Sequence, residues 1–204
     1  LDASQDNELT ISSGLVNELT EEEISSDVYA ELDTMVKDIE KKYEYLFVKV
    51  GNTEHALVIN DPDNPEIRLV RNEETNMGDF ITDAYRIQTG ADIAFMNGGS
   101  IRADIGAGEI KYMDLITVLP WNSEAGVIEV TGQQILDCLE MGARLAPEEC
   151  GGFIQTSGLT YTIDTTMESS VNVNSEGEFV SVDGEYRVKD VMVGEEPLDT
   201  DKTY

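Results

Sequence analysis

Apolar residues recur every three or four positions over residues 24–46, and this spacing predicts one long amphipathic helix near the start of the chain. Thr20 followed by Glu23 forms a capping-box pattern, which places the start of the helix near residue 21. A strand is expected after the helix, at 47–50, and another before it, at 9–11. The stripe comprises Ile24, Val28, Leu32, Met35, Val36, Ile39, Tyr43 and Leu46.

The rest of the chain alternates between helical spacings and short apolar runs. Asn76 is expected to cap a helix that Gly90 ends, and Thr131 with Gln134 forms a second capping box. Further elements are a short helix at 112–118 and strands at 92–96, 127–130, 159–163 and 180–182, with a hairpin signal at Asp183-Gly184. The pattern predicts an α+β fold in which helices pack on a mixed sheet, preceded by the long helix.

The charge balance excludes one class of partner. The 204 residues contain 42 acidic and 13 basic side chains, a net charge of −29. Such a surface repels phosphate backbones, so nucleic-acid binding is disfavoured and the acidity indicates a well-solvated exterior. A small anion would need a local basic pocket. The sequence also has no apolar run long enough to cross a membrane.

Residues for catalysis are scarce. His55 is the only histidine, so the chain lacks the ligands of a dinuclear metal site, and no serine lies in a G-x-S-x-G turn. His55 lies in a turn-like stretch and is read as a surface residue. Cys138 and Cys150 lack the spacing of a zinc site and are read as buried thiols, with a disulfide as the alternative. These features indicate a binding module rather than a complete enzyme.

The strongest binding candidate is the loop at 97–102, where a strand runs into two glycines and an arginine. Consecutive backbone N–H groups there could form an anion-binding concavity. Arg102 adds a planar charged fork, and Asn97 offers a donor and an acceptor to a base edge. The alternative is an ordinary strand-to-loop turn with a surface arginine.

Two more residues are candidates. Trp121, the only tryptophan, follows Leu119-Pro120 and could stack on a base; the alternative is a core tryptophan. Arg71 precedes a predicted helix and could reach an anion at the helix N-terminus, or it could pair with Glu73 or Glu74 on the surface.

Taken in order, these segments resemble the C-terminal domain of the 5′-nucleotidase family, which includes UDP-sugar hydrolases and 2′,3′-cyclic-nucleotide phosphodiesterases. The similarity spans roughly residues 68–204. It is carried by Arg71-x-x-Glu74-Thr75-Asn76-Met77-Gly78 with Ile81-Thr82-Asp83-Ala84, by Asn97-Gly98-Gly99-Ser100-Ile101-Arg102, by Leu119-Pro120-Trp121-Asn122, by Thr131-Gly132 with Leu139-Glu140, and by 151–159.

The resemblance implies a division of the chain. Residues 1–19 would be the tail of an N-terminal metallophosphatase domain, 20–50 the linker helix and first strand, and 51–204 the C-terminal domain, whose final part the family places after residue 204. No cofactor is expected in this chain. Two divalent metal ions are expected in the N-terminal domain, which would be the partner of this one.

The resemblance also implies roles for individual residues. Arg71 and Arg102 match arginines on the phosphate and ribose side of a nucleotide, Asn97 meets the nucleoside within the loop that includes Gly99, Trp121 stacks on one face of the base, and Gly151 approaches the base. Two positions depart from the family pattern. Ser100 replaces a glycine, and Ser123 stands where many members have an asparagine that contacts the purine, which leaves the base preference open.

The expected function is therefore nucleotide recognition within a secreted, metal-dependent phosphoesterase. The parent protein would be a hydrolase, whereas this chain alone would be inactive. The expected location is extracellular, periplasmic or cell-wall associated, with no nucleic-acid partner and no membrane span. The alternative is a non-catalytic surface module whose nucleotide site has degenerated.

Overall fold

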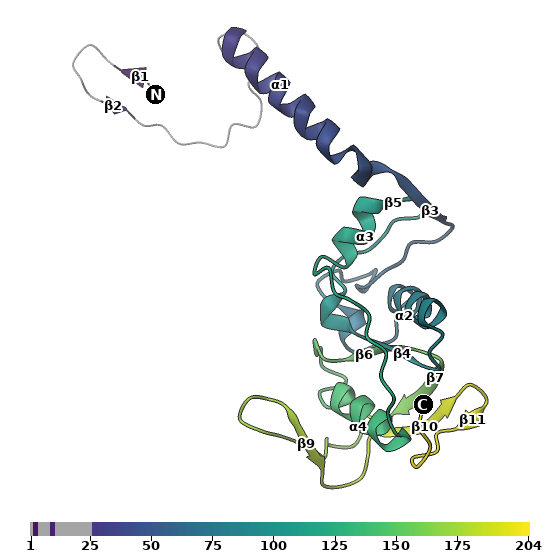
Figure 1. Cartoon of the computed structure of the whole chain (residues 1–204). Helices are drawn as coiled ribbons and strands as arrows, with labels where there is room; N and C mark the ends of the chain where they lie inside the picture. Colours follow the sequence, from purple (N-terminus) through teal and green to yellow (C-terminus); the bar gives the residue numbers. More distant parts are fainter. Residues whose placement is uncertain (1, 4–8, 11–25) are drawn as a thin grey trace. The chain divides into compact units, whose positions relative to one another are not determined.

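The computed structural model describes residues 2–3, 9–10 and 26–204, and it divides the chain into two units, Leu1–Phe47 and Val48–Tyr204 (Figure 1). In the first unit β1 (Asp2–Ala3) pairs with β2 (Leu9–Thr10), and α1 (Ser26–Tyr43) continues into the 3-10 helix η1 (Glu44–Phe47). The long helix is confirmed from Ser26 onward. Ile11, Ile24 and the predicted capping box at Thr20 and Glu23 lie outside the described residues.

The second unit combines short helices with small antiparallel sheets, which confirms the α+β class. The strands pair as β3 with β5, β4 with β6, β8 with β9, and β10 with both β7 and β11. Its helices are η2 (Leu69–Arg71), α2 (Asn76–Thr89), η3 (Gly98–Ser100), α3 (Tyr112–Val118) and α4 (Gly132–Ala143). Its strands are β3 (Lys49–Thr53), β4 (Ala94–Asn97), β5 (Gly108–Lys111), β6 (Ile154–Ser157), β7 (Leu159–Ile163), β8 (Val171–Val173), β9 (Phe179–Val182), β10 (Val188–Val193) and β11 (Glu196–Pro197).

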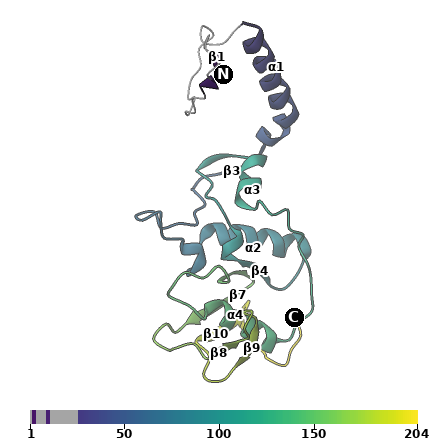
Figure 2. The same ribbon diagram turned by 90° about the vertical axis from the view of Figure 1, so that its left-hand side faces the viewer.

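Two hydrophobic cores hold this unit together. Helix α2 packs against β4 and β6, and α4 packs against β10 and β6 (Figures 1 and 2). The first core includes Val70, Met77 and Ile101, which are fully buried, and the second includes Ile135 and Leu139 of α4. The loop at residue 97 therefore follows a strand, β4, that is held in place by its pairing with β6 and its packing against α2.

Local signals in the sequence set several boundaries. The α3 helix has the predicted bounds, and both hydrogen bonds of the Thr131–Gln134 capping box are present. Gly90 ends α2 in the left-handed conformation, with φ 70°. The cap of α2 is Thr75 rather than Asn76, because the Thr75 hydroxyl accepts the Gly78 N–H.

Three predictions based on strand patterns need correction. The strand expected at 47–50 lies at Lys49–Thr53. Residues 127–130 form no strand, although Val130 and Tyr204 exchange backbone hydrogen bonds of 3.1 and 2.9 Å. Asp183-Gly184 is not a hairpin turn, because β9 pairs back with β8 through a turn containing Gly177, whose φ is 83°. In each case the strand pairing depends on contacts between residues that are distant in the sequence.

The two cysteines are free thiols, so the disulfide alternative does not hold. Cys150 is buried as predicted, but Cys138 is exposed, which corrects the prediction for that residue. His55 lies exposed in a bend, as predicted.

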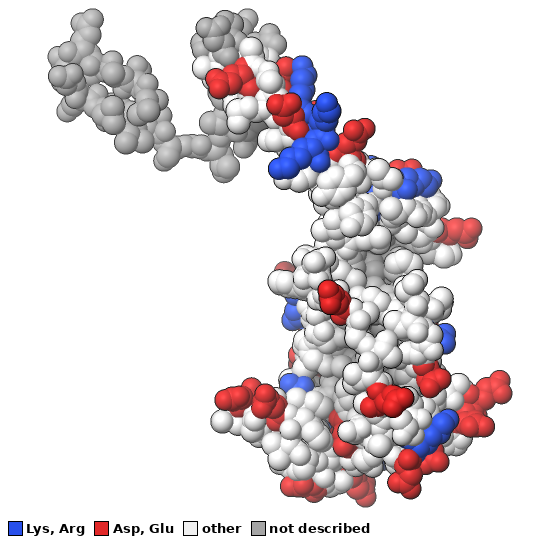
Figure 3. All heavy atoms as spheres, in the orientation of Figure 1, with Lys and Arg blue, Asp and Glu red and all other residues white. Residues whose placement is uncertain are grey.

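Acidic side chains are spread over the face of the Val48–Tyr204 unit shown in Figure 3, with few basic ones among them. None of the helices in the described part of the chain is long and apolar enough to cross a membrane. A cluster of basic side chains on this unit therefore marks a candidate site for an anion.

Candidate functional site

The loop that follows β4 is built around two glycines that lie against neighbouring backbone. A Cβ on Gly98 would lie 1.9 Å from the Val70 carbonyl oxygen, and one on Gly99 would lie 2.7 Å from the Gly151 carbonyl oxygen. Neither distance is compatible with a side chain. The glycines thus allow the loop to pack against η2 on one side and against Gly151 on the other.

Most backbone N–H groups of this loop are already used within the protein. Gly98 donates to Phe153 O at 2.7 Å, Gly99 to Gly151 O at 2.9 Å, and Arg102 to Val118 O at 2.9 Å. These bonds correct the sequence-based idea of an open anion-binding concavity. Any anion bound here must be held mainly by side chains.

Asn97 lies at the end of β4 with its amide fixed at both atoms. Its Nδ2 donates to the Gly151 carbonyl at 3.0 Å, and its Oδ1 accepts the Ser100 hydroxyl at 2.8 Å. The side chain is nevertheless exposed, with one N–H and one lone pair left for a ligand. Asn97 is therefore both accessible and held in place.

Three arginines supply positive charge beside the loop. Burial, followed by the nearby Arg71 and Arg102 guanidinium groups, lowers the pKa of Arg68. Arg68 Nη2 donates to Ile101 O at 2.7 Å, and Arg102 Nη1 donates to Gly99 O at 3.1 Å. Within residues 26–204 none of the three forms an ion pair, so the surface alternative for Arg71 is not observed. Glu149, which accepts the Arg68 backbone N–H at 2.9 Å, offsets part of this charge. Three clustered guanidinium groups that form no ion pair in this part of the chain still suit an anionic group.

The buried Nε of Arg71 has no hydrogen-bond partner in the described structure. Arg71 is the last residue of η2, and its carbonyl accepts the Cys150 N–H at 2.9 Å. Its backbone is thus fixed to the segment that contains Gly151, while its side chain retains an unused donor. Because Nε is buried, a ligand acceptor would reach this N–H only after the Arg71 side chain moved.

Trp121 lies in the loop after α3 and is 62% exposed, which excludes the core alternative. The next residue, Asn122, has a φ of 49°, a left-handed conformation that asparagine tolerates better than most residues. Ser123 follows and lines a cavity of about 660 Å³ together with Asn97 and Ser100. The loop therefore presents an aromatic surface to solvent and a hydroxyl to the cavity.

The structure brings part of the predicted site together directly. Asn97, Gly99, Arg102 and Gly151 are joined by hydrogen bonds, and Arg71 is joined through Cys150. Ser123 shares the cavity with Asn97, and Trp121 is not among the residues that line that cavity.

Sequence reasoning missed Arg68 and Ser100 as members of the site. Arg68 lies three residues before Arg71, and this repeat of arginine in an acidic chain was an available signal. Ser100 was noted only as a departure from glycine, and its bond to Asn97 is visible only in three dimensions.

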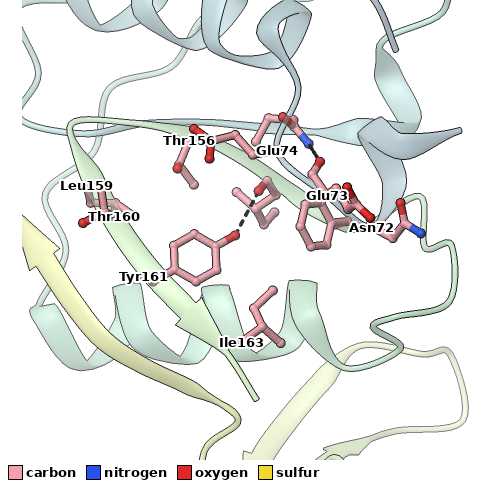
Figure 4. Close-up of a pocket in the computed structure, with 11 residues that line it drawn as sticks. Asn72, Glu73, Glu74, Thr156, Leu159, Thr160, Tyr161 and Ile163 are labelled. Atoms are coloured by element: carbon pink, nitrogen blue, oxygen red, sulfur yellow. Dashed lines mark hydrogen bonds between the residues drawn. The ribbon is translucent and has the colours of Figure 1, made fainter. Parts of the chain in front are cut away.

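A second cavity, of about 270 Å³, lies beside β6 and β7 (Figure 4). The Tyr161 hydroxyl donates to the Ile154 carbonyl at 3.3 Å, and burial is the main cause that raises the pKa of Tyr161 to about 12. Glu73 and Glu74 line the same cavity. None of the site residues predicted from the sequence lines this cavity, and its carboxylates make it unsuitable for an anion.

Metal ligands do not gather anywhere in the described residues, since no group of three His, Cys, Asp or Glu side chains is close enough to hold an ion. The described residues thus offer binding groups rather than a ligand set for a metal. In chemical terms, the arginines are suited to an anionic group and the Asn97 amide to a hydrogen-bonding group attached to it.

Comparison with known proteins shows the family to which the chain belongs. Residues 49–204 match the family model for the 5′-nucleotidase C-terminal domain. A 5′-nucleotidase of Vibrio parahaemolyticus is 32% identical over 167 residues, covering 82% of this chain and 28% of that protein. The cell wall protein Lmo0130 of Listeria monocytogenes is 28% identical, over 86% of this chain and 22% of that protein.

Solved structures agree with the sequence comparison. A 5′-nucleotidase precursor from Thermus thermophilus has a TM-score of 0.67 and 28% identity, covering 90% of this chain and 33% of that one. The chain thus belongs to the 5′-nucleotidase family and comprises its C-terminal domain. It spans about a quarter to a third of the length of these relatives.

Proposed function

We propose that this chain is the nucleotide-recognition domain of a metal-dependent phosphoesterase of the 5′-nucleotidase type. The observation that carries the proposal is the arginine group, Arg68, Arg71 and Arg102, placed beside the fixed amide of Asn97 in a chain of net charge −29. A phosphate ester with an attached nucleoside satisfies both features, because it joins an anion to a hydrogen-bonding base.

The arginines would bind the phosphate and ribose side of the ligand. Arg71 and Arg102 each keep donors free of ion pairs, and Arg71 Nε is buried and unused. Hydrogen bonds to charged groups contribute roughly 1.5–3 kcal/mol. AMP should therefore bind more tightly than adenosine, and more so at low salt.

Trp121 would supply the aromatic surface for the base. The exposed indole can stack on a planar ring, which is worth about 1–3 kcal/mol per base. Asn97, Gly151 and Ser123 would then meet the nucleoside from the loop side. This arrangement matches the hydrogen-bonded cluster of Asn97 and Gly151 and the cavity that Ser123 shares with Asn97.

Hydrolysis would take place in a partner domain. An N-terminal metallophosphatase domain with two divalent metal ions would activate water, and this chain would hold the nucleoside so that the phosphate reaches those ions. The 5′-nucleotidase and cell-wall names of the relatives support a hydrolase that is secreted or attached to the cell surface. The isolated chain is expected to bind nucleotide without hydrolysing it.

Calorimetric titration of AMP and of adenosine into the chain tests the proposal. Arg102→Ala should weaken AMP binding about tenfold or more and adenosine binding less, because it removes a donor to the anionic group. Lys189→Ala is the matched control, since this cation lies on β10 and pairs with Asp164. Equal binding of AMP by wild type and Arg102→Ala, or no binding by either, would favour the degenerate surface module instead.

A further inference from the structure

We propose that Ser100 is a positioning residue, which holds the Asn97 amide in the orientation that receives the nucleoside. The inference rests on the proposed function, since Asn97 is the residue through which Ser100 acts. Ser100 itself stands where the family pattern has glycine, so the inference concerns a feature of this particular chain.

The geometry assigns separate anchors to the two ends of the amide. The Ser100 hydroxyl donates to Asn97 Oδ1 at 2.8 Å, and Asn97 Nδ2 donates to the Gly151 carbonyl at 3.0 Å. With one anchor the amide could still rotate about its terminal torsion, which has broad wells. The Gly151 carbonyl can only accept, so it decides which end of the amide is the nitrogen, and the Ser100 hydroxyl holds the other end and fixes the torsion.

The backbone places Ser100 where it can form this bond. Asn97 precedes the single turn of η3, and Ser100 ends that turn three residues later, so its side chain returns to the side of Asn97. At Gly98 and Gly99 an added Cβ would meet neighbouring backbone at 1.9 and 2.7 Å. Position 100 is therefore the one in this turn that carries a side chain.

Both groups face the place where a ligand would lie. Asn97 and Ser100 line the same cavity of about 660 Å³, together with Ser123. The Asn97 side chain is exposed, and an exposed amide without anchors would lose rotational freedom when a ligand binds. Fixing it beforehand lowers that cost, so Ser100 should raise affinity through its bond to Asn97.

Adenosine affinity of the full 204-residue chain, followed through Trp121 fluorescence, tests the inference with four variants. Ser100→Ala should weaken binding about three- to tenfold, the value of one neutral hydrogen bond. Ser100→Thr keeps the hydroxyl and should restore most of the affinity. In the Asn97→Ala background, Ser100→Ala should have no further effect, because the two residues act as one unit.

A ligand-free measurement separates this inference from the proposed function. The side-chain N–H order parameter of Asn97, measured by NMR, should fall below about 0.6 in Ser100→Ala and stay high in wild type and Ser100→Thr. Unchanged order and unchanged affinity in Ser100→Ala would overturn the inference while leaving nucleotide recognition intact. An equal loss in both backgrounds would also overturn it, since Ser100 would then act independently of Asn97. Absence of adenosine binding by wild type would overturn the proposed function and the affinity role, whatever the order parameter shows.

Discussion

At the scale of single residues, the site depends on places where a side chain is absent as much as on those where one is present. Gly98 and Gly99 let the loop after β4 lie against η2 and Gly151, which brings Asn97 and Arg102 to the same surface. The side chains that then face solvent are polar or aromatic. Close backbone packing thus creates the binding surface.

Substitution of Gly98 should therefore be costly. In Gly98→Ala the added methyl would overlap the Val70 carbonyl oxygen, so we expect the free energy of unfolding to fall by about 3 kcal/mol. Urea denaturation measures this change. Gly106→Ala is the control, because no atom lies within 4 Å of its added Cβ. Equal stability of the two variants would contradict the close packing of Gly98 against the Val70 carbonyl.

Asp79, in the first turn of α2, should make stability depend on pH. Burial, followed by the carboxylates of Glu74 and Asp83, raises its pKa to about 6, whereas in the unfolded chain it ionises near pH 4. The folded state therefore holds this proton more tightly, and the stability that results is present below about pH 4 and lost as pH rises through 6. Because the group is partly exposed, the loss should be about 1 kcal/mol.

The measurement compares wild type with Asp79→Asn by urea denaturation between about pH 4 and pH 7. The wild-type free energy of unfolding should decline relative to that of the variant over this interval. A difference that stays constant with pH would show that Asp79 ionises normally in the folded chain.

Residue chemistry was predictable from sequence where it depended on residue type alone. Arg71, Asn97 and Arg102 became candidates because an arginine near a Gly-rich loop carries weight in a chain with only 13 basic residues, and the family resemblance then favoured them. Arg68 and Ser100 were missed because their importance comes from neighbours, Ile101 O and Asn97 Oδ1, that the fold brings to them. The prediction of free N–H groups at the loop was wrong for the same reason, because the carbonyls that accept them are distant in sequence.

At the scale of elements, α4 is fixed to β10 by two buried charged residues that do not pair with each other. Glu140 accepts the backbone N–H groups of Arg187 and Val188 at 3.0 and 2.8 Å. The Arg187 guanidinium in turn donates to the carbonyls of Ala143, Arg144 and Ala146 at the end of the helix. It satisfies carbonyls that a helix C-terminus leaves unpaired.

Removing the Arg187 guanidinium should destabilise the packing of α4 against β10. Arg187→Met removes the guanidinium donor of the Arg144 and Ala146 carbonyls, whereas the Ala143 carbonyl still accepts the Ala146 N–H. We therefore expect a loss of about 3–5 kcal/mol in the free energy of unfolding. Lys189→Met, two residues along β10, removes an ion pair with Asp164 at 3.6 Å and an exposed contact with Met167 Sδ, and it should cost less than about 1 kcal/mol. Similar small losses in both variants would contradict the anchoring role of Arg187.

Elements with local signals were predicted well, and those that depend on distant partners were not. The bounds of α3 and the capping box of α4 follow from residues three or four positions apart. Residues 127–130 have an apolar strand pattern, yet only Val130 finds a backbone partner, at Tyr204. The Asp183-Gly184 signal failed because β9 pairs with β8 instead of β10.

At the scale of the whole molecule, the chain consists of two units, and the family domain lies within the second. The matched residues, 49–204, coincide almost entirely with the unit Val48–Tyr204. Both hydrophobic cores and all seven predicted site residues belong to that unit.

A protein consisting of residues 48–204 should therefore fold by itself. We expect a cooperative thermal transition within a few degrees of that of the full chain, because both clusters of buried apolar residues lie within 48–204. Circular dichroism measures the transition. A fragment that shows no cooperative unfolding would mean that residues 1–47 contribute to the core.

The most direct test of nucleotide recognition is the fluorescence of Trp121, because the only indole of the chain lies at the proposed base-stacking position. Titration with AMP should give saturable quenching, which Asn97→Ala and Arg102→Ala weaken and Lys189→Ala leaves unchanged. Fluorescence that stays constant up to millimolar AMP, or quenching that is the same in all four proteins, would contradict binding of a nucleotide against Trp121.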